Sequence, residues 1–295
     1  MQKKIIDHYL EYGLFTYPGL YEPYLKTLPD NIPDLGLLLR MNFIHITTLD
    51  AGNTGTNADL KYGDMNKVPW YRQSEDDNLP TTTAMLAEIF RRDPKGLTME
   101  CSVEDKLVLT CRYEAILMAS ILKTKGIPAR VRAGFAGYFE GDTVAWDHWI
   151  NQYWNKEESR WVTIDVDGSL HRTGFDMYDI PDGKFEWSAN AWLAAREGKR
   201  DEDYFNNAGG YKGLITIAWQ LFYDFHCMMN SEIIYLHHPE LVTSQNFNKD
   251  SEEKLQEIDE FARLMLNPDE NFEKLVEIWN TKKEFRLLRG ALLGL

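Results

Sequence analysis

Cysteine is scarce in this chain of 295 residues. Its only cysteines are Cys101, Cys111 and Cys227, an odd number without CxxC spacing. This pattern argues against a disulfide framework and against a four-thiolate zinc site. Few cysteines and no disulfide framework are typical of proteins in a reducing compartment, so we expect a cytoplasmic protein.

Long apolar runs are also missing. The apolar pair after Lys3 and Lys4 is followed at once by Asp7 and His8, so the hydrophobic region of a signal peptide does not develop. No stretch approaches the 18 or so apolar residues of a membrane span. We therefore expect no membrane partner.

Basic residues are outnumbered, with 32 Lys and Arg against 46 Asp and Glu, a formal charge of -14 and a pI near 5.0. Nucleic-acid binding draws much of its affinity from neutralising phosphates, which such a charge balance does not favour. We expect neither nucleic acid nor anionic membrane as a partner. An acidic balance is most often a device for solubility, and it says little about chemistry.

Apolar and aromatic residues are abundant. The chain is 44% hydrophobic and 13% aromatic and holds nine Trp, whereas disordered chains lack such groups. Its length suffices for one large core or two smaller ones. We predict a compact globule.

The first part of the chain has a helical pattern from residue 2 to about residue 48, interrupted by prolines. Residues 50–78 are rich in Gly, Asn and Asp, which favour turns, and we predict a long loop there. Residues 83–92 form the next predicted helix. We expect residues 1–80 to be a helical segment and loop that pack on a core.

A central helix is predicted from Cys111 to about Lys125. Thr110 can cap its start, and Gly126 with the following Pro128 marks its end. From residue 115 to 122 every residue except Ser120 is apolar. A helix without a polar face over two turns must be buried.

Extended segments follow at residues 127–135, 146–154 and 161–166, the last two joined by a charged loop that indicates a hairpin. Helices return from residue 188, with predicted helices at 211–229, from a cap at Asp250 to 266, and from Asn267-Pro268 onward. The order of elements predicts an α+β fold with a core at 81–186 and a C-terminal helical region at 187–295.

Three polar residues lie at positions that suit catalytic side chains. Cys111 opens a buried helix, where unpaired N–H groups and the helix dipole favour a thiolate. His148 lies within a predicted strand, and Asp165 lies in another strand where a carboxylate needs a partner. A lone cysteine at a helix start is more often a small buried hydrophobe, so the partners decide.

Hairpin geometry can bring the partners together. If Trp154 pairs with Trp161, His148 faces Asp167 directly and Asp165 is the diagonal neighbour on the same face. Either aspartate could then reach the imidazole. Thiol, imidazole and carboxylate would serve as nucleophile, base and orienting group in covalent acyl chemistry.

Four segments carry a resemblance to a known family: Cys111-Arg-Tyr-Glu114, Leu122 to Arg130 with Gly-Ile-Pro-Ala-Arg, Asp147-His-Trp149, and Trp161-Val-Thr-Ile-Asp165. Together they resemble the core of the transglutaminase-like superfamily, which includes transglutaminases, bacterial thiol proteases and peptide N-glycanases. The resemblance covers about residues 100–170. A second stretch, from Phe175 to Pro181 with Ala191-Trp192 beyond it, further resembles bacterial transglutaminase-like proteins whose substrate is not established.

The resemblance implies a papain-like α+β core, in which a helix bearing the thiol packs on an antiparallel sheet. It also selects Asp165 over Asp167 and implies a Cys111–His148–Asp165 triad. The implied activity is acyl transfer or amide hydrolysis on a peptide, protein or small amide, without a cofactor. Amide hydrolysis, isopeptide formation and deglycosylation share one acyl-enzyme intermediate, so the family does not fix the reaction.

Residues around the triad are candidates for binding substrate. Trp146 and Trp149 could line a groove, although cross-strand aromatic pairs more often stabilise a sheet. Arg112 lies beside the thiol and favours its ionised form. The backbone N–H of Cys111 would be one oxyanion donor, and the loop around Trp70 is a candidate for the second.

Two other classes of function stay open. A non-catalytic peptide- or partner-binding module could retain the same fold. A metal-dependent hydrolase is more distant, because His226-Cys227 and His237-His238 give no four-ligand spacing, and we predict no metal site. The sequence does not set the oligomeric state.

Overall fold

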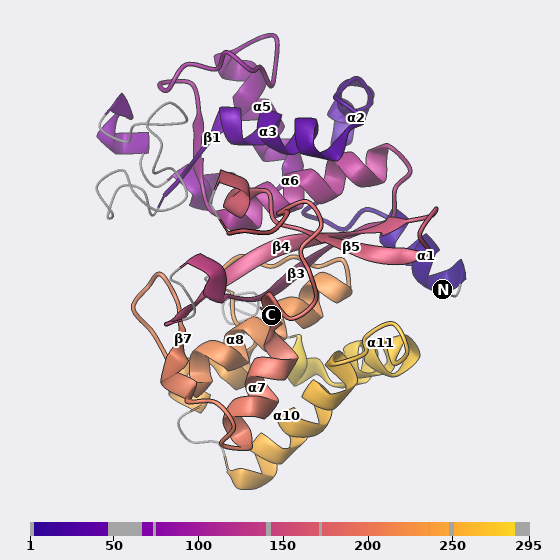
Figure 1. The fold of residues 1–295 in the computed structure, drawn as a ribbon, viewed down its shortest axis with the longest axis vertical. Helices are drawn as coiled ribbons and strands as arrows, with labels where there is room; N and C mark the ends of the chain where they lie inside the picture. The colour runs from indigo at the N-terminus through magenta and orange to yellow at the C-terminus, as the bar shows by residue number, and fades with distance from the viewer. Residues whose placement is uncertain are drawn as a thin grey trace. The chain divides into compact units, whose positions relative to one another are not determined.

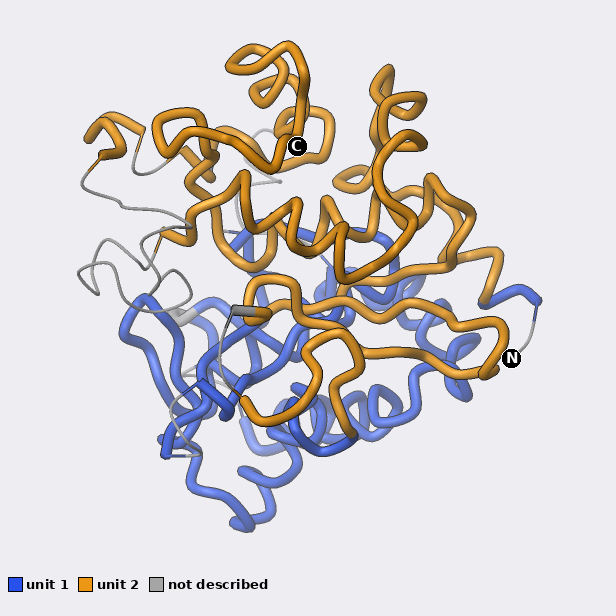
Figure 2. Tube along the Cα trace, turned by 45° about the horizontal axis from the view of Figure 1, so that its top comes forward, with its two compact units in different colours: residues 1–5, 132–148, 182–295 blue, residues 6–131, 149–181 orange. Residues whose placement is uncertain are grey.

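A computed structural model gives the structure of the protein and describes residues 3–46, 67–72, 75–139, 143–170, 173–235, 237–247 and 251–286. The chain divides into two compact units, which Figure 2 colours separately. Unit 1 holds residues 1–5, 132–148 and 182–295, and unit 2 holds residues 6–131 and 149–181. The predicted segments 1–80, 81–186 and 187–295 stay a prediction.

Unit 2 contains most of the helices of the first half of the chain and three short or edge strands (Figure 1). Its α-helices are α1 (Lys3–Leu10), whose first residues fall in unit 1, α2 (Glu22–Leu25), α3 (Ile32–Asn42), α5 (Thr82–Arg92) and α6 (Cys111–Thr124). Its strands are β1 (Phe43–His45), β2 (Leu107–Leu109) and β5 (Arg160–Ile164), and its 3-10 helices are η1 (Gly19–Tyr21), η4 (Trp70–Arg72), η5 (Glu75–Asn78) and η7 (Asp167–Leu170).

Strands β1 and β2 pair in parallel, and His45 aligns with Leu109. α3 ends at Asn42 and the chain passes directly into β1, whose residues are all buried. The helical pattern predicted through residues 43–45 is wrong, because these residues form β1. The apolar run of residues 35–46 continues through the strand, so hydrophobicity alone does not mark where the helix stops.

The predicted central helix is confirmed as α6, and each of its residues is buried. Thr110 occupies the N-cap position. At the other end Gly126 has a φ of +76°, while its N–H bonds the carbonyl of Lys123 and the N–H of Ile127 bonds that of Leu122. These bonds form a Schellman motif, which requires a left-handed residue that glycine adopts without strain.

The predicted hairpin is also confirmed. Strand β4 (Ala145–Asn155) pairs antiparallel with β5, and Trp154 aligns with Trp161. The ladder of β5 ends at Ile164, and the chain then turns so that Asp165 donates its N–H to the carbonyl of Met177. Asp165 therefore lies just beyond the strand. The expectation that Asp167 shares the strand face is wrong, because that residue begins η7.

Unit 1 is mostly helical. Its elements are the later part of β3 (Ala129–Ala136), the start of β4, η6 (Gly137–Phe139), β6 (Phe185–Trp187), α7 (Ser188–Arg196), η8 (Glu202–Tyr204), β7 (Phe205–Asn206), α8 (Leu214–Met228), η9 (Glu240–Val242), α9 (Ser244–Phe247), α10 (Glu252–Met265), α11 (Phe272–Thr281) and η10 (Lys283–Phe285). Helix α7 packs against α8 and α10. A buried pair joins Arg132 on β3 to Asp224 on α8, with Nε–Oδ1 at 2.7 Å.

Five strands form one sheet in the order β5-β4-β3-β6, with β7 pairing parallel to β4. The pairs β4–β5 and β3–β6 are antiparallel. The predicted α+β class is thus confirmed as a mixture of helices with a largely antiparallel sheet. The predicted C-terminal helices are present with later starts, since α8 begins at Leu214 and α11 at Phe272; Asp250 lies outside the described residues, and Ser251 caps α10.

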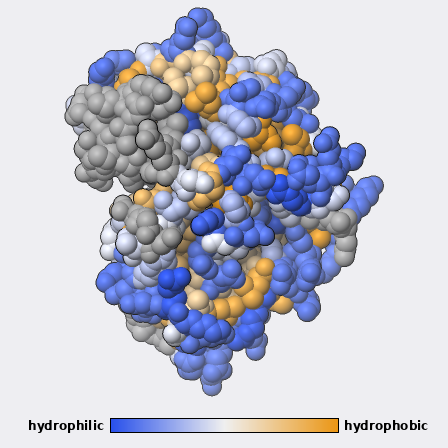
Figure 3. All heavy atoms as spheres, in the orientation of Figure 1, coloured by the Kyte–Doolittle hydropathy of each residue, from blue (hydrophilic) through white to orange (hydrophobic). Residues whose placement is uncertain are grey.

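The face drawn in Figure 3 carries mostly hydrophilic residues with smaller apolar patches between them. This agrees with a chain in which charged residues make up 26% of the total. Within the described residues, no helix combines the length and hydropathy that crossing a membrane requires.

Candidate active site

Cys111 is the first residue of α6, and it is nearly buried, with 6% of its surface exposed. The preceding strand β2 fixes this position, because it ends two residues earlier and is paired with β1. A thiol at a helix N-terminus is held where the helix dipole favours its ionised form. All three cysteines lie in the described residues, and none forms a disulfide.

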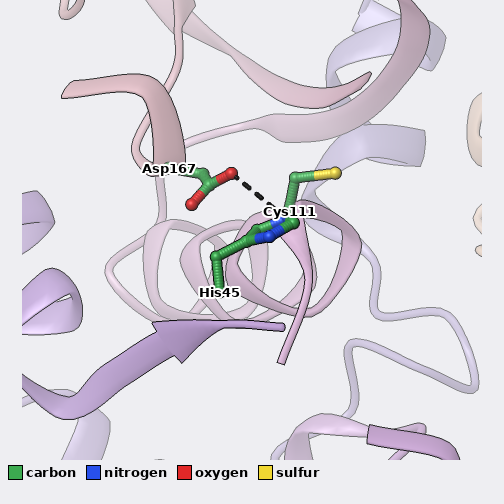
Figure 4. Close-up of side chains that lie close together, drawn as sticks. All are labelled: His45, Cys111 and Asp167. Carbon is green, nitrogen blue, oxygen red and sulfur yellow. Dashed lines mark ion pairs between the residues drawn. The ribbon is translucent and has the colours of Figure 1, made fainter. Parts of the chain in front are cut away.

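His45 and Asp167 lie beside this thiol (Figure 4). The sulfur, one imidazole nitrogen and one carboxylate oxygen are all within 4.8 Å of one another. His45 is at the end of β1 and Asp167 is at the start of η7, with Nε2–Oδ2 at 3.5 Å. Three elements of unit 2 thus converge on one thiol–imidazole–carboxylate cluster.

The imidazole of His45 is held toward its charged form. Burial by itself lowers the pKa of His45, but the charge of Asp167 and a hydrogen bond with Cys111 outweigh burial, so the net pKa is raised above 6.5. A protonated imidazole next to a thiol favours the thiolate by direct attraction. The charge of Asp167 therefore favours the protonated form of the imidazole beside the Cys111 sulfur.

Arg40 anchors Asp167 from behind. Its Nη1 donates to Asp167 Oδ1 at 2.9 Å and also bonds Glu114 Oε1, and all three side chains are buried. Burial lowers the pKa of Arg40, but the two carboxylates outweigh it and raise the pKa. One guanidinium thus joins α3, α6 and η7 beneath the thiol.

Glu114 lies one turn along α6 from the thiol and is buried. Burial raises the pKa of Glu114 above its usual range, against the opposing charge of Arg40. The carboxyl of Glu114 therefore holds a proton more readily than that of an exposed glutamate.

Asp165, the predicted orienting acid, is fully buried in a tight turn. Its Oδ1 accepts the N–H of Gly168 at 2.8 Å. A Cβ at Gly168 would lie 2.2 Å from Asp165 Oδ2, so no larger residue fits without moving the carboxylate. The turn therefore fixes where this acid lies.

His148, the predicted base, is the last residue of unit 1 on β4 and is buried. Its ring meets that of Phe139 edge to face, with centroids 4.9 Å apart. Its partnership with Cys111 and Asp165 stays a prediction, as does the role of the Trp70 loop. Trp70 itself is in η4 and 82% exposed, whereas residues 50–66 and 73–74 of the predicted loop lie outside the described residues.

The predicted substrate-binding residues have different settings. Arg112 is fully buried, with its guanidinium near the rings of Phe15, Tyr113 and Trp149. Trp149 is buried too, whereas Trp146 is half-buried. Their role in binding a substrate stays a prediction.

Sequence reasoning missed His45, Arg40 and Glu114. A signal existed, because Arg40 and His45 are polar residues within the apolar run 35–46 and Glu114 is a charge in the most buried helix. The rule that singled out His148, a titratable residue within an apolar element, applies equally to His45. No spacing motif links positions 45, 111 and 167, so the cluster as a whole could not be read as a metal or catalytic set.

A thiol, an imidazole and a carboxylate in mutual reach are the groups that cysteine-dependent catalysis uses. Residues 93–166 match the family model of the transglutaminase-like superfamily, which confirms the resemblance for this part of the chain. The matched segment contains Cys111, His148 and Asp165, whereas His45 and Asp167 lie outside it. Searches of curated proteins and of solved structures gave no significant match.

Proposed function

We propose that the protein is a cysteine-dependent enzyme that transfers or hydrolyses the acyl group of an amide, with Cys111 as nucleophile. One observation carries the proposal: the Cys111 thiol, which begins buried helix α6 within the segment that matches the transglutaminase-like superfamily, shares a cluster with His45 and Asp167 from outside that segment. The substrate class is a peptide, a protein or a small amide. The fold we propose for the core is papain-like.

Two histidines have separate tasks in this proposal. His45 stays protonated, because Asp167 raises the pKa of His45, and its positive charge keeps the sulfur ionised before substrate binds. His148 is the proton carrier for the leaving group and Asp165 its orienting acid, as the family resemblance implies. One histidine would serve both tasks poorly, because an imidazole that a buried carboxylate keeps charged is a weak proton donor.

The reaction proceeds through a thioester. The thiolate of Cys111 attacks the carbonyl carbon, a C–S bond forms, and the carbonyl oxygen takes the negative charge near the N-terminus of α6. The C–N bond then breaks as His148, which took up the proton of the Cys111 thiol when the thiolate formed, gives that proton to the leaving amine. Water or a second amine attacks the thioester, gives its proton to the imidazole, and restores the thiolate.

Acyl-enzyme formation tests the proposal directly. The protein is treated with p-nitrophenyl acetate, and acetylated peptides are located by mass spectrometry. We expect one acetyl group on Cys111, its loss in Cys111→Ala, and its retention in the matched control Cys101→Ser. Equal acetylation of all three cysteines would contradict the proposal and favour the non-catalytic binding module.

Turnover then separates the two histidines. Peptide and glutamine-donor amides, each with and without an added amine, distinguish hydrolysis from transfer. His148→Ala should lose amide turnover, while His45→Gln should slow the acylation step and shift its pH dependence to higher pH. Unchanged turnover in His148→Ala would remove that residue from the proposed triad.

A further inference from the structure

The donor atoms beside the thiol match the preferences of a zinc ion. Thiolate, imidazole and carboxylate are the three ligand types that Zn²⁺ accepts in proteins. Cys111, His45 and Asp167 offer one of each within 4.8 Å, on three different elements (Figure 4). A set that can act as thiol, base and acid can therefore also act as a chelate.

One donor atom lacks a full complement of contacts. Asp167 Oδ1 accepts the hydrogen bond of Arg40 at 2.9 Å. Within the described residues, Asp167 Oδ2 accepts no hydrogen bond, although it is buried and directed at His45. Buried carboxylate oxygens are normally satisfied, so an oxygen of this kind points to a ligand. A cation at this point would supply the missing contact.

The separations suit the ion. Bond lengths of about 2.0–2.3 Å place the ligand atoms of a tetrahedral zinc site roughly 3.3–3.8 Å apart. His45 Nε2 and Asp167 Oδ2 already have this spacing, at 3.5 Å. The Cys111 sulfur lies within 4.8 Å of both residues' ligand atoms and is the third donor. Arg40 holds the carboxylate from behind, as the outer partners of metal ligands commonly do.

We propose that His45, Cys111 and Asp167 form a Zn²⁺-binding site that reversibly blocks the nucleophile. On binding, a Zn–S bond to Cys111, a Zn–N bond to His45 and a Zn–O bond to Asp167 form in place of bonds from the ion to water, and the proton of the thiolate–imidazolium pair passes to solvent. Neither sulfur nor metal changes oxidation state. Three protein ligands leave a fourth position for water. The blocking rests on the proposed function, whereas the binding does not.

Cobalt substitution tests the binding without any measurement of turnover. Co²⁺ is added to the protein, and the thiolate-to-cobalt charge-transfer absorption is recorded; Zn²⁺ should then abolish the band by displacement. We expect the band in the wild type and in the matched control His148→Ala. It should be absent in Cys111→Ala and at least about tenfold weaker in affinity in His45→Gln and Asp167→Asn.

Three results would overturn the inference: no band in the wild type, an unchanged band in His45→Gln, or a band lost in His148→Ala. Circular dichroism checks that each variant is folded, and protection of Cys111 from iodoacetamide by Zn²⁺ gives a second readout. A protein that shows the band but forms no acyl-enzyme loses the proposed function and keeps the metal site. An active enzyme without the band loses the metal site alone.

Discussion

His45 Nε2 lies 3.5 Å from Asp167 Oδ2, and this contact ties the end of β1 to the first residue of η7 directly beside the thiol of Cys111. The charge of Asp167 explains why the imidazole of His45 favours its protonated form although it is buried. The contact also places an imidazole next to the Cys111 thiol from outside the segment that matches the transglutaminase-like superfamily. The site of this chain thus includes groups supplied by its N-terminal region.

The first prediction concerns the titration of His45. Its pKa should lie above 6.5, because Asp167 and Cys111 outweigh the effect of burial. In Asp167→Asn the pKa of His45 should fall, because the charge that mainly opposes the effect of burial is removed. The chemical shift of the imidazole protons followed by NMR across pH gives both values. A wild-type midpoint at or below 6.5 would contradict this reading.

The same shift sets a dependence of stability on pH. A histidine whose pKa is raised on folding stabilises the fold fully below its unfolded value of about 6.5, and the effect disappears as pH rises through the folded pKa. The wild type should therefore exceed His45→Gln in unfolding free energy most at pH 6 or below, and least in alkaline solution. Urea titrations at several pH values measure the difference. A difference in unfolding free energy that grows with pH would contradict the expected direction of this effect.

Removal of the Arg40 side chain should lower the free energy of unfolding more than removal of an exposed arginine side chain. Arg40→Leu leaves Asp167 and Glu114 buried without their cation, which typically costs about 3–5 kcal/mol. The matched control Arg160→Leu removes an exposed pair with Asp179, worth less than about 1 kcal/mol. Urea denaturation compares the two. Equal losses would show that the buried network contributes little.

Gly168 should tolerate no side chain. In Gly168→Ala the new Cβ would meet Asp165 Oδ2 at 2.2 Å, so the turn or the carboxylate must move. We expect a loss of about 1–3 kcal/mol in stability, as for other overpacked sites. If Asp165 orients the base, amide turnover should also fall toward that of Asp165→Asn. Gly209→Ala, where the closest contact is 3.4 Å, is the matched control.

The sequence predicts some parts of this molecule well, for physical reasons. Helix α6 and its end at Gly126 follow from local rules, since an apolar run and a left-handed glycine specify their own conformation. The pairing of Trp154 with Trp161 follows in the same way from a short charged loop between β-forming segments. Cys111 is found because its position depends on that local pattern.

The rest of the site depends on contacts between distant segments. β1 pairs with β2 across more than 60 residues, and only this pairing brings His45 to the thiol. Asp167 leaves the strand because the chain turns at Asp165 toward Met177, which a continued hairpin does not predict. The role of Arg40 follows only from the positions of the two carboxylates that it contacts, Glu114 and Asp167. Periodicity carries no information on such pairings.

A further prediction lies outside the site, in α8. Burial lowers the pKa of His226 to about 3, so the unfolded chain takes up a proton at this residue between about pH 6.5 and pH 3 while the folded chain does not. Stability should therefore fall with decreasing pH, by up to about 1.4 kcal/mol per pH unit from this residue. His226→Leu should show a shallower loss between pH 6 and pH 4 in urea titrations. An identical slope would contradict the assignment.

The central claim is that Cys111 is an ionised nucleophile at neutral pH. Its rate of alkylation by iodoacetamide, measured peptide by peptide as a function of pH in the presence of EDTA, tests this most directly. We expect Cys111 to react fastest, with its half-maximal rate at a lower pH than that of Cys101, and we expect its pH profile to shift to higher pH in His45→Gln. Cys101, whose pKa burial raises above 9.0, is the internal reference. A Cys111 that reacts as slowly as Cys101, with the same pH profile, would contradict the account.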